Sequence, residues 1–452
     1  MPSKRLDNET SPITVAPTPQ LRRLGRLLAG ASIAVIFAAT LTPQSGQPET
    51  SPLCIICGSL GGVDALLNVF LFLPLGVGLA LSGARAVPAL LAMLFLTAGI
   101  EVAQFFFIGG RDGNIGDVLT NVLGGTLGFA LARGTTVWRR PTRHAAFALC
   151  VSWSAIWIAI QLLSSYAFAP ALPTSLYYGQ IARVFEHMAT FDGQVLSATI
   201  DTVTVPNFGF AKTEQFHELL QNGASVGAVV IPAAPTPRIA PIVRIADDKR
   251  REIVLLGQDH SDLVFGLRTG AAGLRLRPPL FAMREVFPAR GDGAKILMSD
   301  TLRLRARYAT TGVEMRADSG GELRQRHLAV YPALAWILVL PGRWYVEGTR
   351  DELLFSFLLL GVSLIPLGYW SFFLLTFGRG DAAPGWTSAL SVLVLLVLLA
   401  IGLALVPSAF GLPAASLGAW LAAVTGLLLG AAIGGAESQT ALRNSPESFE
   451  VV

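Results

Sequence analysis

The feature that most constrains the fold is a set of long apolar runs at both ends of the chain. A helix needs roughly 20 apolar residues to cross the ~30 Å hydrocarbon core of a bilayer. Because backbone groups in lipid must be paired within the protein, each run is predicted to be a helix. The predicted spans are residues 27–42, 64–82, 87–108, 115–133, 145–168, 352–376, 387–407 and 414–435.

Charge is scarce and unevenly placed. Charged residues make up 14% of the 452 positions and hydrophobic residues 52%, whereas a soluble globular chain carries roughly a quarter charged residues. Most of the charges lie between the fifth and sixth predicted spans. We therefore predict a membrane α-helical bundle of about 8 transmembrane helices with a soluble domain inserted into it.

Basic residues predict the orientation of the spans. The positive-inside rule places the side with the excess of Lys and Arg in the cytoplasm. Basic residues precede the first span and follow the second and fourth, at Lys4, Arg5, Arg22, Arg23, Arg26, Arg85, Arg133, Arg139, Arg140 and Arg143. Both termini are therefore predicted to be cytoplasmic, and the inserted domain extracytoplasmic.

Polar side chains interrupt the membrane spans near their predicted outer ends. Glu101 and Gln104 are three residues apart, and Asp117 and Asn121 are four apart, so each pair lies on one helical face. A carboxylate in a membrane helix is costly unless it is paired or hydrated, which makes these residues functional candidates. The alternative is structural: hydrogen bonds between helices, with Arg111 paired to Glu101 or Asp117, would lock the hairpin together.

These residues carry a resemblance to the VanZ-like family of bacterial membrane proteins. The matching stretches are Asn68-Val-Phe-Leu-Phe-Leu-Pro-Leu-Gly76, Glu101-Val-Ala-Gln104, and Arg111 followed by Asp117-Val-Leu-Thr-Asn121-Val-Leu-Gly-Gly125, within about residues 27–135. The resemblance implies a cell-envelope setting, and its namesake is associated with low-level resistance to the glycopeptide teicoplanin. The family has no settled reaction. The characteristic polar positions that it transfers are Asn68, Glu101, Gln104, Arg111, Asp117 and Asn121.

A C-x-x-C pair, Cys54 and Cys57, lies in the first predicted outer loop. In an oxidising extracytoplasmic space we expect a disulfide. Reduced thiols and a metal or redox site are the alternatives, although neither a second C-x-x-C nor a His pair accompanies the first in this loop.

The insert, residues 175–327, predicts an all-β sandwich. Short β-rich runs alternate with turn residues, which is typical of that architecture. The runs are Gln194–Val203, Ala228–Pro232, Ile242–Ile245, Glu252–Gly257, Asp262–Leu267, Lys295–Ser299 and Leu302–Tyr308. The rhythm of strands between Phe191 and Arg268 resembles the concanavalin A-like or laminin-G-like jelly roll, which implies binding of carbohydrate or protein.

Several functions of the insert are excluded or left open by its residues. Glycoside hydrolysis needs a pair of suitably placed carboxylates, and the E-x-D-x-E strand of glucanases is absent, so we expect a binding module. No dense Asp/Asn loop marks a calcium site, and no other cofactor is expected. Arg303, Arg305 and Arg307 alternate along one predicted strand and share a face. That face is either simply solvated or a surface for an anionic partner.

The predicted organisation is a basic lead (1–26), a VanZ-like domain (27–135), a fifth span with linkers (136–174), the sandwich (175–327), an interfacial segment (328–346), the last spans (347–436) and a tail (437–452). The expected partners are the lipid bilayer and envelope carbohydrate or lipid-linked glycan; no nucleic-acid signature is present. A membrane-embedded enzyme, with Glu101 or Asp117 as the catalytic group, and a small transporter are the alternative functions.

Overall fold

The computed structural model describes residues 18–43, 53–111, 113–185, 188–232, 234–287, 301–377 and 386–443. Its contacts divide the chain into two compact units, Met1–Arg140 and Pro141–Val452. Within the described ranges, 8 helices are long and apolar enough to cross a membrane. This confirms the predicted helical part of the fold. Most of the predicted lead, the predicted strand Lys295–Ser299 and the end of the predicted tail lie outside the described residues.

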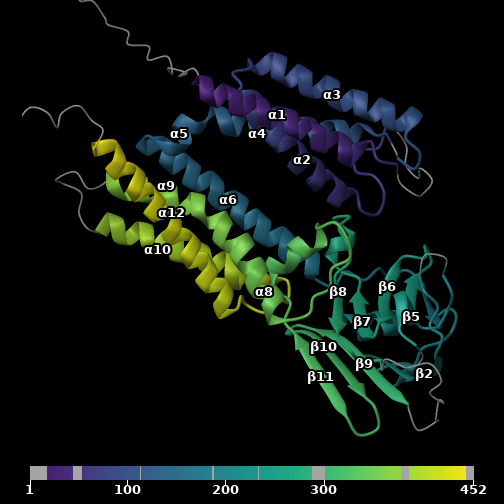
Figure 1. Ribbon diagram of the computed structural model, residues 1–452. Coiled ribbons are helices and arrows are strands. Elements are labelled where there is room, and N and C mark those ends of the chain that lie inside the picture. The colour runs from purple at the N-terminus through teal and green to yellow at the C-terminus, as the bar shows by residue number, and fades with distance from the viewer. Residues whose placement is uncertain are drawn as a thin grey trace, which may run out of the picture. The chain divides into compact units, whose positions relative to one another are not determined.

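The first unit is a bundle of membrane-length helices. They are α1 (Pro19–Thr40), α2 (Gly61–Leu81), α3 (Ala86–Phe107) and α4 (Ile115–Arg133), followed by the short α5 (Thr135–Arg139). Helix α2 packs against α1, α3 and α4, and α3 also packs against α4 (Figure 1). Helix α1 begins well before the predicted residue 27. The Thr18 side chain accepts a hydrogen bond from the Leu21 N–H, and Pro19 occupies the first helical position, where its fixed φ is favourable.

Glycines bring the backbones of α2 and α4 into direct contact. A Cβ atom added to Gly124 would lie 2.2 Å from the carbonyl oxygen of Val69, and one added to Gly128 would lie 2.0 Å from that of Leu73. Both distances are too short for any real side chain. Close approach through small residues is a common way to pack membrane helices, so this G-x-x-x-G pair fixes the spacing of the two helices.

The second unit contains the remaining membrane-length helices. They are α6 (Arg143–Phe168); α8 (Thr349–Ser356), which continues through the π-helical turn η3 (Phe357–Gly361) into α9 (Val362–Phe377); α10 (Trp386–Ala400), which continues through η4 (Ile401–Leu405) into α11 (Val406–Ala409); and α12 (Leu417–Arg443). Helix α9 packs against α6 and α12 (Figure 1). Their shared core contains Trp157, Leu364, Leu403 and Ala423.

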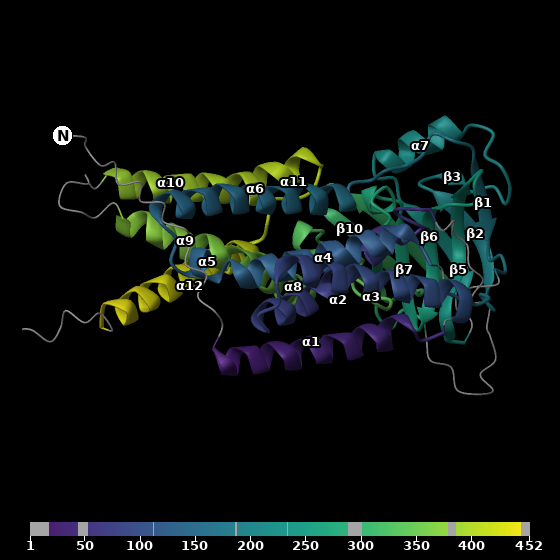
Figure 2. The same cartoon turned by 90° about the horizontal axis from the view of Figure 1, so that it is seen from above.

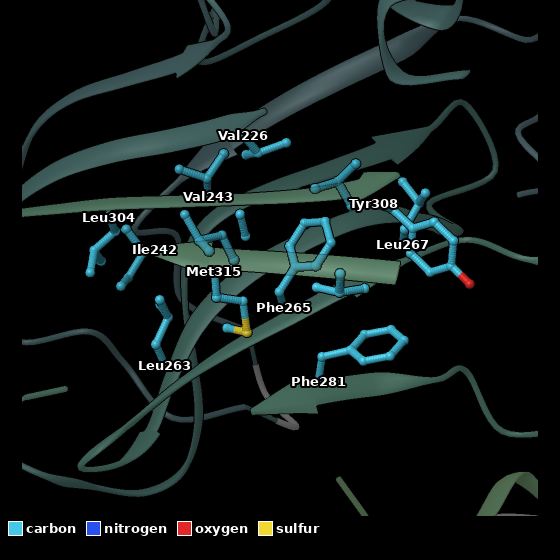
Figure 3. Packing of buried hydrophobic residues seen from close by; sticks show 14 of the residues in the cluster. Val226, Ile242, Val243, Leu263, Phe265, Leu267, Phe281, Leu304, Tyr308 and Met315 are labelled. Carbon is cyan, nitrogen blue, oxygen red and sulfur yellow. The ribbon is translucent and has the colours of Figure 1, made fainter. Parts of the chain in front are cut away.

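The inserted region folds into two antiparallel sheets, which confirms the predicted sandwich. The five-stranded sheet has the order β1 (Tyr177–Ile181), β5 (Thr236–Asp247), β6 (Glu252–His260), β7 (Asp262–Leu267), β8 (Leu280–Met283). The six-stranded sheet has the order β11 (Leu323–Leu328), β10 (Gly312–Asp318), β9 (Leu302–Ala309), β4 (Val226–Ile231), β2 (Gln194–Ile200), β3 (Val203–Thr204). Figure 3 shows the core between them, where Phe265 and Phe281 of one sheet face Tyr308 and Met315 of the other.

Some elements of this unit were not predicted from the sequence. The strands β1, β8, β10 and β11 are among them, and so is α7 (Thr213–Gln221), a helix that buries Phe216 and Leu220 at one end of the sandwich (Figure 2). In the predicted interfacial segment, the 3-10 helix η2 (Pro332–Leu338) packs Leu334 and Leu338 into the core of the sandwich.

The two sheets differ in how they bury their faces. Strand β7 is buried at every position, whereas β9 alternates strictly between buried and exposed residues up to Tyr308. A strand that is covered on both faces has a continuous apolar sequence, whereas a strand covered on one face alternates between apolar and polar residues. The six-stranded sheet therefore presents an open outer face along β9.

Helix α6 ends inside the sandwich. Its last residue, Phe168, is fully buried in the core between the sheets. The hydroxyl of Tyr308 donates a hydrogen bond of 2.8 Å to the Phe168 carbonyl oxygen, and the Gly270 N–H donates to the Ala169 carbonyl at 2.9 Å. A Cβ on Gly270 would lie 2.1 Å from the carbonyl oxygen of Tyr166. Helix and sandwich are thus joined by direct packing, without a spacer.

We expect Tyr308→Phe to lower the free energy of unfolding of this unit by about 1–3 kcal/mol, the usual cost of leaving a buried acceptor without a donor. Burial also raises the pKa of the Tyr308 hydroxyl above its usual range, so this group remains a donor across the working pH range. Thermal unfolding of the detergent-solubilised chain measures the effect. Tyr178→Phe, at a side chain that is 37% exposed, is the matched control. Equal midpoints for the two variants would show that the hydrogen bond contributes nothing.

Candidate functional site

A chain of hydrogen bonds joins three helices at one end of the first unit. Asn68 near the start of α2 donates from Nδ2 to Oδ1 of Asp117 at 2.8 Å. Asn114 donates from Nδ2 to Oδ2 of Asp117 at 2.9 Å. The backbone N–H of Asn114 donates to Oε2 of Glu101, on α3, at 2.9 Å. We call Asn68, Glu101, Asn114 and Asp117 the polar network.

Asn114 is the centre of the polar network because it caps α4. Its Oδ1 accepts a hydrogen bond of 2.9 Å from the Asp117 N–H, which satisfies one of the free N–H groups of the first turn. The carboxylate of Asp117 lies in that same turn, where the helix dipole favours a negative charge. The α3–α4 loop approaches closely, since a Cβ on Gly113 would lie 2.6 Å from the Glu101 carbonyl oxygen.

The two carboxylates of the polar network differ in how fully they are paired. Asp117 accepts a side-chain hydrogen bond on each oxygen, from Asn68 and from Asn114. Glu101 is only 9% exposed, yet its Oε1 receives no hydrogen bond from any described residue. Both carboxylate oxygens of Asp117 are therefore used in hydrogen bonds within the polar network, whereas Oε1 of Glu101 is an acceptor that the described residues leave unused.

Gln104 and Arg111 bind the carboxyl end of α1. Gln104 donates from Nε2 to the Thr40 carbonyl at 2.8 Å, and Arg111 donates to the carbonyls of Ala39, at 2.7 Å, and Thr42, at 3.2 Å. The last carbonyls of a helix lack partners within it, and a cation there is favoured by the dipole. The predicted lock between Arg111 and Glu101 or Asp117 is wrong in this respect: within the described ranges Arg111 forms a salt bridge with neither carboxylate.

Gln104 also has an unused acceptor. Its Oε1 is buried and receives no hydrogen bond from the described part of the chain. The orientation of the amide follows from the partner, because the Thr40 carbonyl can only accept. Glu101 and Gln104 are three residues apart on α3 and so share a face. This face thus carries one free carboxylate oxygen and one free amide oxygen.

Asn121 lies one turn deeper than Asp117 and contacts α3. Its Nδ2 is 2.8 Å from Oγ1 of Thr97, and the side chain is 2% exposed. This pair joins α3 to α4 below the polar network, so Asn121 belongs to the packing of the two helices.

The loop that carries Cys54 and Cys57 covers the start of α4. The two cysteines form a disulfide, with their Cα atoms 5.7 Å apart. The Gly116 N–H donates to the Cys54 carbonyl at 3.2 Å, and a Cβ on Gly116 would lie 1.9 Å from the Ile55 carbonyl oxygen. The loop is therefore seated on the same helix end that Asn114 caps.

Of the six predicted polar positions, the structure brings together Asn68, Glu101 and Asp117. The other three have different partners: Gln104 and Arg111 bind α1, and Asn121 contacts Thr97. The prediction from sequence did not include Asn114, although an Asn directly before an apolar helix is a common N-cap signal. Thr97 gives no such signal, since a single Thr in an apolar span is unremarkable. Among the described residues, no group of three or more His, Cys, Asp and Glu side chains could hold a metal ion.

Comparison with known proteins bears on this unit alone. Residues 15–139 match the family model described as VanZ/LLP1, and this stretch contains every residue of the polar network. Neither a search of curated proteins nor a search of solved structures finds a match for the chain. Together with the apolar helices, the match supports a membrane protein whose residues 15–139 form a VanZ-like domain.

Proposed function

We propose that this VanZ-like membrane protein lies in a bacterial plasma membrane and binds glycan or lipid-linked material of the cell envelope. Both termini are cytoplasmic in this proposal, and the sandwich, as a lectin-like module of the concanavalin A or laminin-G type, is extracytoplasmic. Arg22, Arg23 and Arg26 before the first membrane core support this orientation through the positive-inside rule.

The observation that carries the proposal is the pair of unused acceptors on α3. The buried Oε1 of Gln104 has no hydrogen-bond partner among the described residues, and leaving such an atom unpaired costs about 1–3 kcal/mol. Oε1 of Glu101 is a second acceptor without a hydrogen bond from the described residues, and together the two favour a ligand that donates hydrogen bonds. Sugar hydroxyls and amide N–H groups are donors of this kind. Both acceptors lie in the last two turns of α3 rather than at its centre.

In a bacterial host that expresses the chain, we expect the protein to change sensitivity to a teicoplanin-type glycopeptide. Glu101→Gln should abolish most of that change, because the substitution replaces a charged acceptor with a weaker neutral one while retaining an oxygen for the Asn114 N–H. Growth inhibition is measured at matched protein levels. Glu322→Gln, at an exposed carboxyl of the sandwich, is the control.

Wild-type sensitivity in Glu101→Gln, with a normal protein level and elution profile, would overturn the proposal. An enzyme acting on lipid-linked glycan is a separate function with its own readout. Purified wild-type protein would then convert a lipid-linked disaccharide to a new product, and Glu101→Gln would abolish turnover without weakening binding. Binding without any product supports the proposal as stated.

A further inference from the structure

The open face of the six-stranded sheet carries a cross-strand pair of like charges. On β9, Arg305 is exposed, and it lies directly opposite Arg316 of β10 in the strand register. Side chains at such positions have Cβ atoms about 4.5–5.5 Å apart, and like charges there are unfavourable. On the other side of Arg305, the neighbouring position on β4 is Gly227, which adds no side chain to the face.

A pocket of about 450 Å³ lies over this pair. Its volume falls within the ~300–1,000 Å³ typical of small-molecule sites. The sheet contributes Arg305, Arg307, Glu314 and Arg316, while the turn after β2 and the segment between α7 and β4 contribute polar groups, among them Asp201, Asn222 and Ser225. All of these residues belong to the second unit.

The acids of the pocket neutralise the like-charged pair only in part. Glu314 is held by Arg307 through two hydrogen bonds of 2.9 Å each, and this contact lowers the pKa of the Glu314 carboxyl below its usual range. Arg316 reaches Glu314 only at 4.0 Å. No described residue forms a hydrogen bond or an ion pair with the Arg305 guanidinium. Arg305 is therefore unpaired among the described residues and Arg316 has only the long contact with Glu314, so the two adjacent guanidiniums can bind one anionic group, for which the arginine fork is well suited.

The rim of the pocket supplies acceptors as well as donors. Asp201 has a left-handed backbone conformation, with φ of 50°, and its Oδ1 accepts from both the N–H and the hydroxyl of Ser225, at 2.8 and 3.2 Å. Asn222 ends α7 beside it. A sulfate has no hydrogens for such carboxylate and amide oxygens and a phosphate has at most two, whereas a sugar ring has several hydroxyls.

We propose that this pocket binds an acidic sugar, with Arg305 and Arg316 on its carboxylate and with Asp201 and Asn222 on its hydroxyls. The ligand class is an oligosaccharide that contains uronic acid. The inference uses only residues of the second unit and does not depend on the polar network of the VanZ-like domain. It rests on the lectin-like role proposed for the sandwich, and its failure would leave the proposed site at the polar network intact.

The test is binding of trigalacturonate to the full chain in detergent, measured by isothermal titration calorimetry. We expect Arg305→Gln and Arg316→Gln each to weaken the affinity at least tenfold. Arg303→Gln is the matched control, because Arg303 is exposed on the same strand and the same face but does not line the pocket. It should weaken the affinity less than twofold.

The chemistry of the ligand is tested with three further probes. Maltotriose has hydroxyls without a carboxylate, inorganic phosphate has charge without sugar hydroxyls, and vesicles of phosphatidylglycerol present anionic headgroups. Each should bind at least tenfold more weakly than trigalacturonate. The assignment would be overturned by any of three results. They are no binding of trigalacturonate, a loss of affinity in Arg303→Gln equal to that in the pocket variants, and arginine-dependent binding of a further probe as tight as that of trigalacturonate. Thermal unfolding identifies any variant that fails to fold. In that case Arg305→Lys, which keeps the charge but loses the fork, replaces it, and we expect this variant to weaken the affinity for trigalacturonate more than threefold.

Discussion

Gly128→Leu should prevent the VanZ-like domain from assembling. Since a Cβ at this position would lie 2.0 Å from the Leu73 carbonyl oxygen, the clash is with backbone, which cannot move away as a flexible side chain can. Overpacking a core costs about 1–3 kcal/mol when side chains can adjust, and a clash of helix backbones should exceed that range. We expect little or no monodisperse protein after solubilisation, measured by fluorescence-detected size-exclusion chromatography.

Gly99→Leu is the control for this experiment. Gly99 lies in the membrane helix α3, and a Cβ added to it meets no atom within 4 Å, so the same substitution changes hydrophobicity and helix propensity without a clash. Recovery of Gly128→Leu at the level of Gly99→Leu would show that α2 and α4 are not held by this contact.

Asp117→Asn should have the second-largest effect, and it should act on stability. The amide retains one acceptor oxygen but replaces the other with an NH2 group, which then faces the donating Nδ2 of Asn68 or Asn114. A buried donor that loses its acceptor costs about 1–3 kcal/mol, and more when the acceptor was charged. The measurement is the thermal midpoint of the detergent-solubilised chain.

The comparison with Glu101→Gln separates the two carboxylates. Glu101 accepts one hydrogen bond, from the Asn114 N–H, and a glutamine oxygen can take over that role. We therefore expect Glu101→Gln to retain a nearly wild-type midpoint while Asp117→Asn loses several degrees. The reverse order would mean that Glu101, and not Asp117, holds the helices together.

Much of this fold follows from local patterns in the sequence. The apolar runs gave the membrane helices because only a helix pairs every backbone group within one segment. The buried strands β6 and β7 were predicted because their residues are apolar on both faces. By contrast, β10 and β11 carry charged residues between their apolar ones, among them Glu314, Arg316 and Arg324, and nothing local distinguishes them from loops. Helix α7 was not predicted for a related reason, because only Phe216 and Leu220 of its nine residues are buried.

Three of the four residues of the polar network were predictable from the sequence, but Asn114 and the hydrogen bonds between the residues were not. The cost of a carboxylate in lipid identifies Glu101 and Asp117 from sequence alone. The partner of Arg111 could not be predicted in this way. Opposite charges nearby in the sequence predicted an ion pair, yet the guanidinium binds the carbonyl end of α1. Backbone acceptors exist at the carboxyl end of every helix, and no residue type identifies them in the sequence. The partner of Arg111 therefore depends on the tertiary structure.

The burial of Phe168 between the sheets has a mechanical consequence. A domain on a flexible linker can rotate relative to the helix that carries it. Here the Phe168–Tyr308 and Ala169–Gly270 hydrogen bonds oppose such rotation. Any torque on the sandwich passes directly into the axis of α6. The direction in which the sandwich faces is therefore set by the direction of that helix axis.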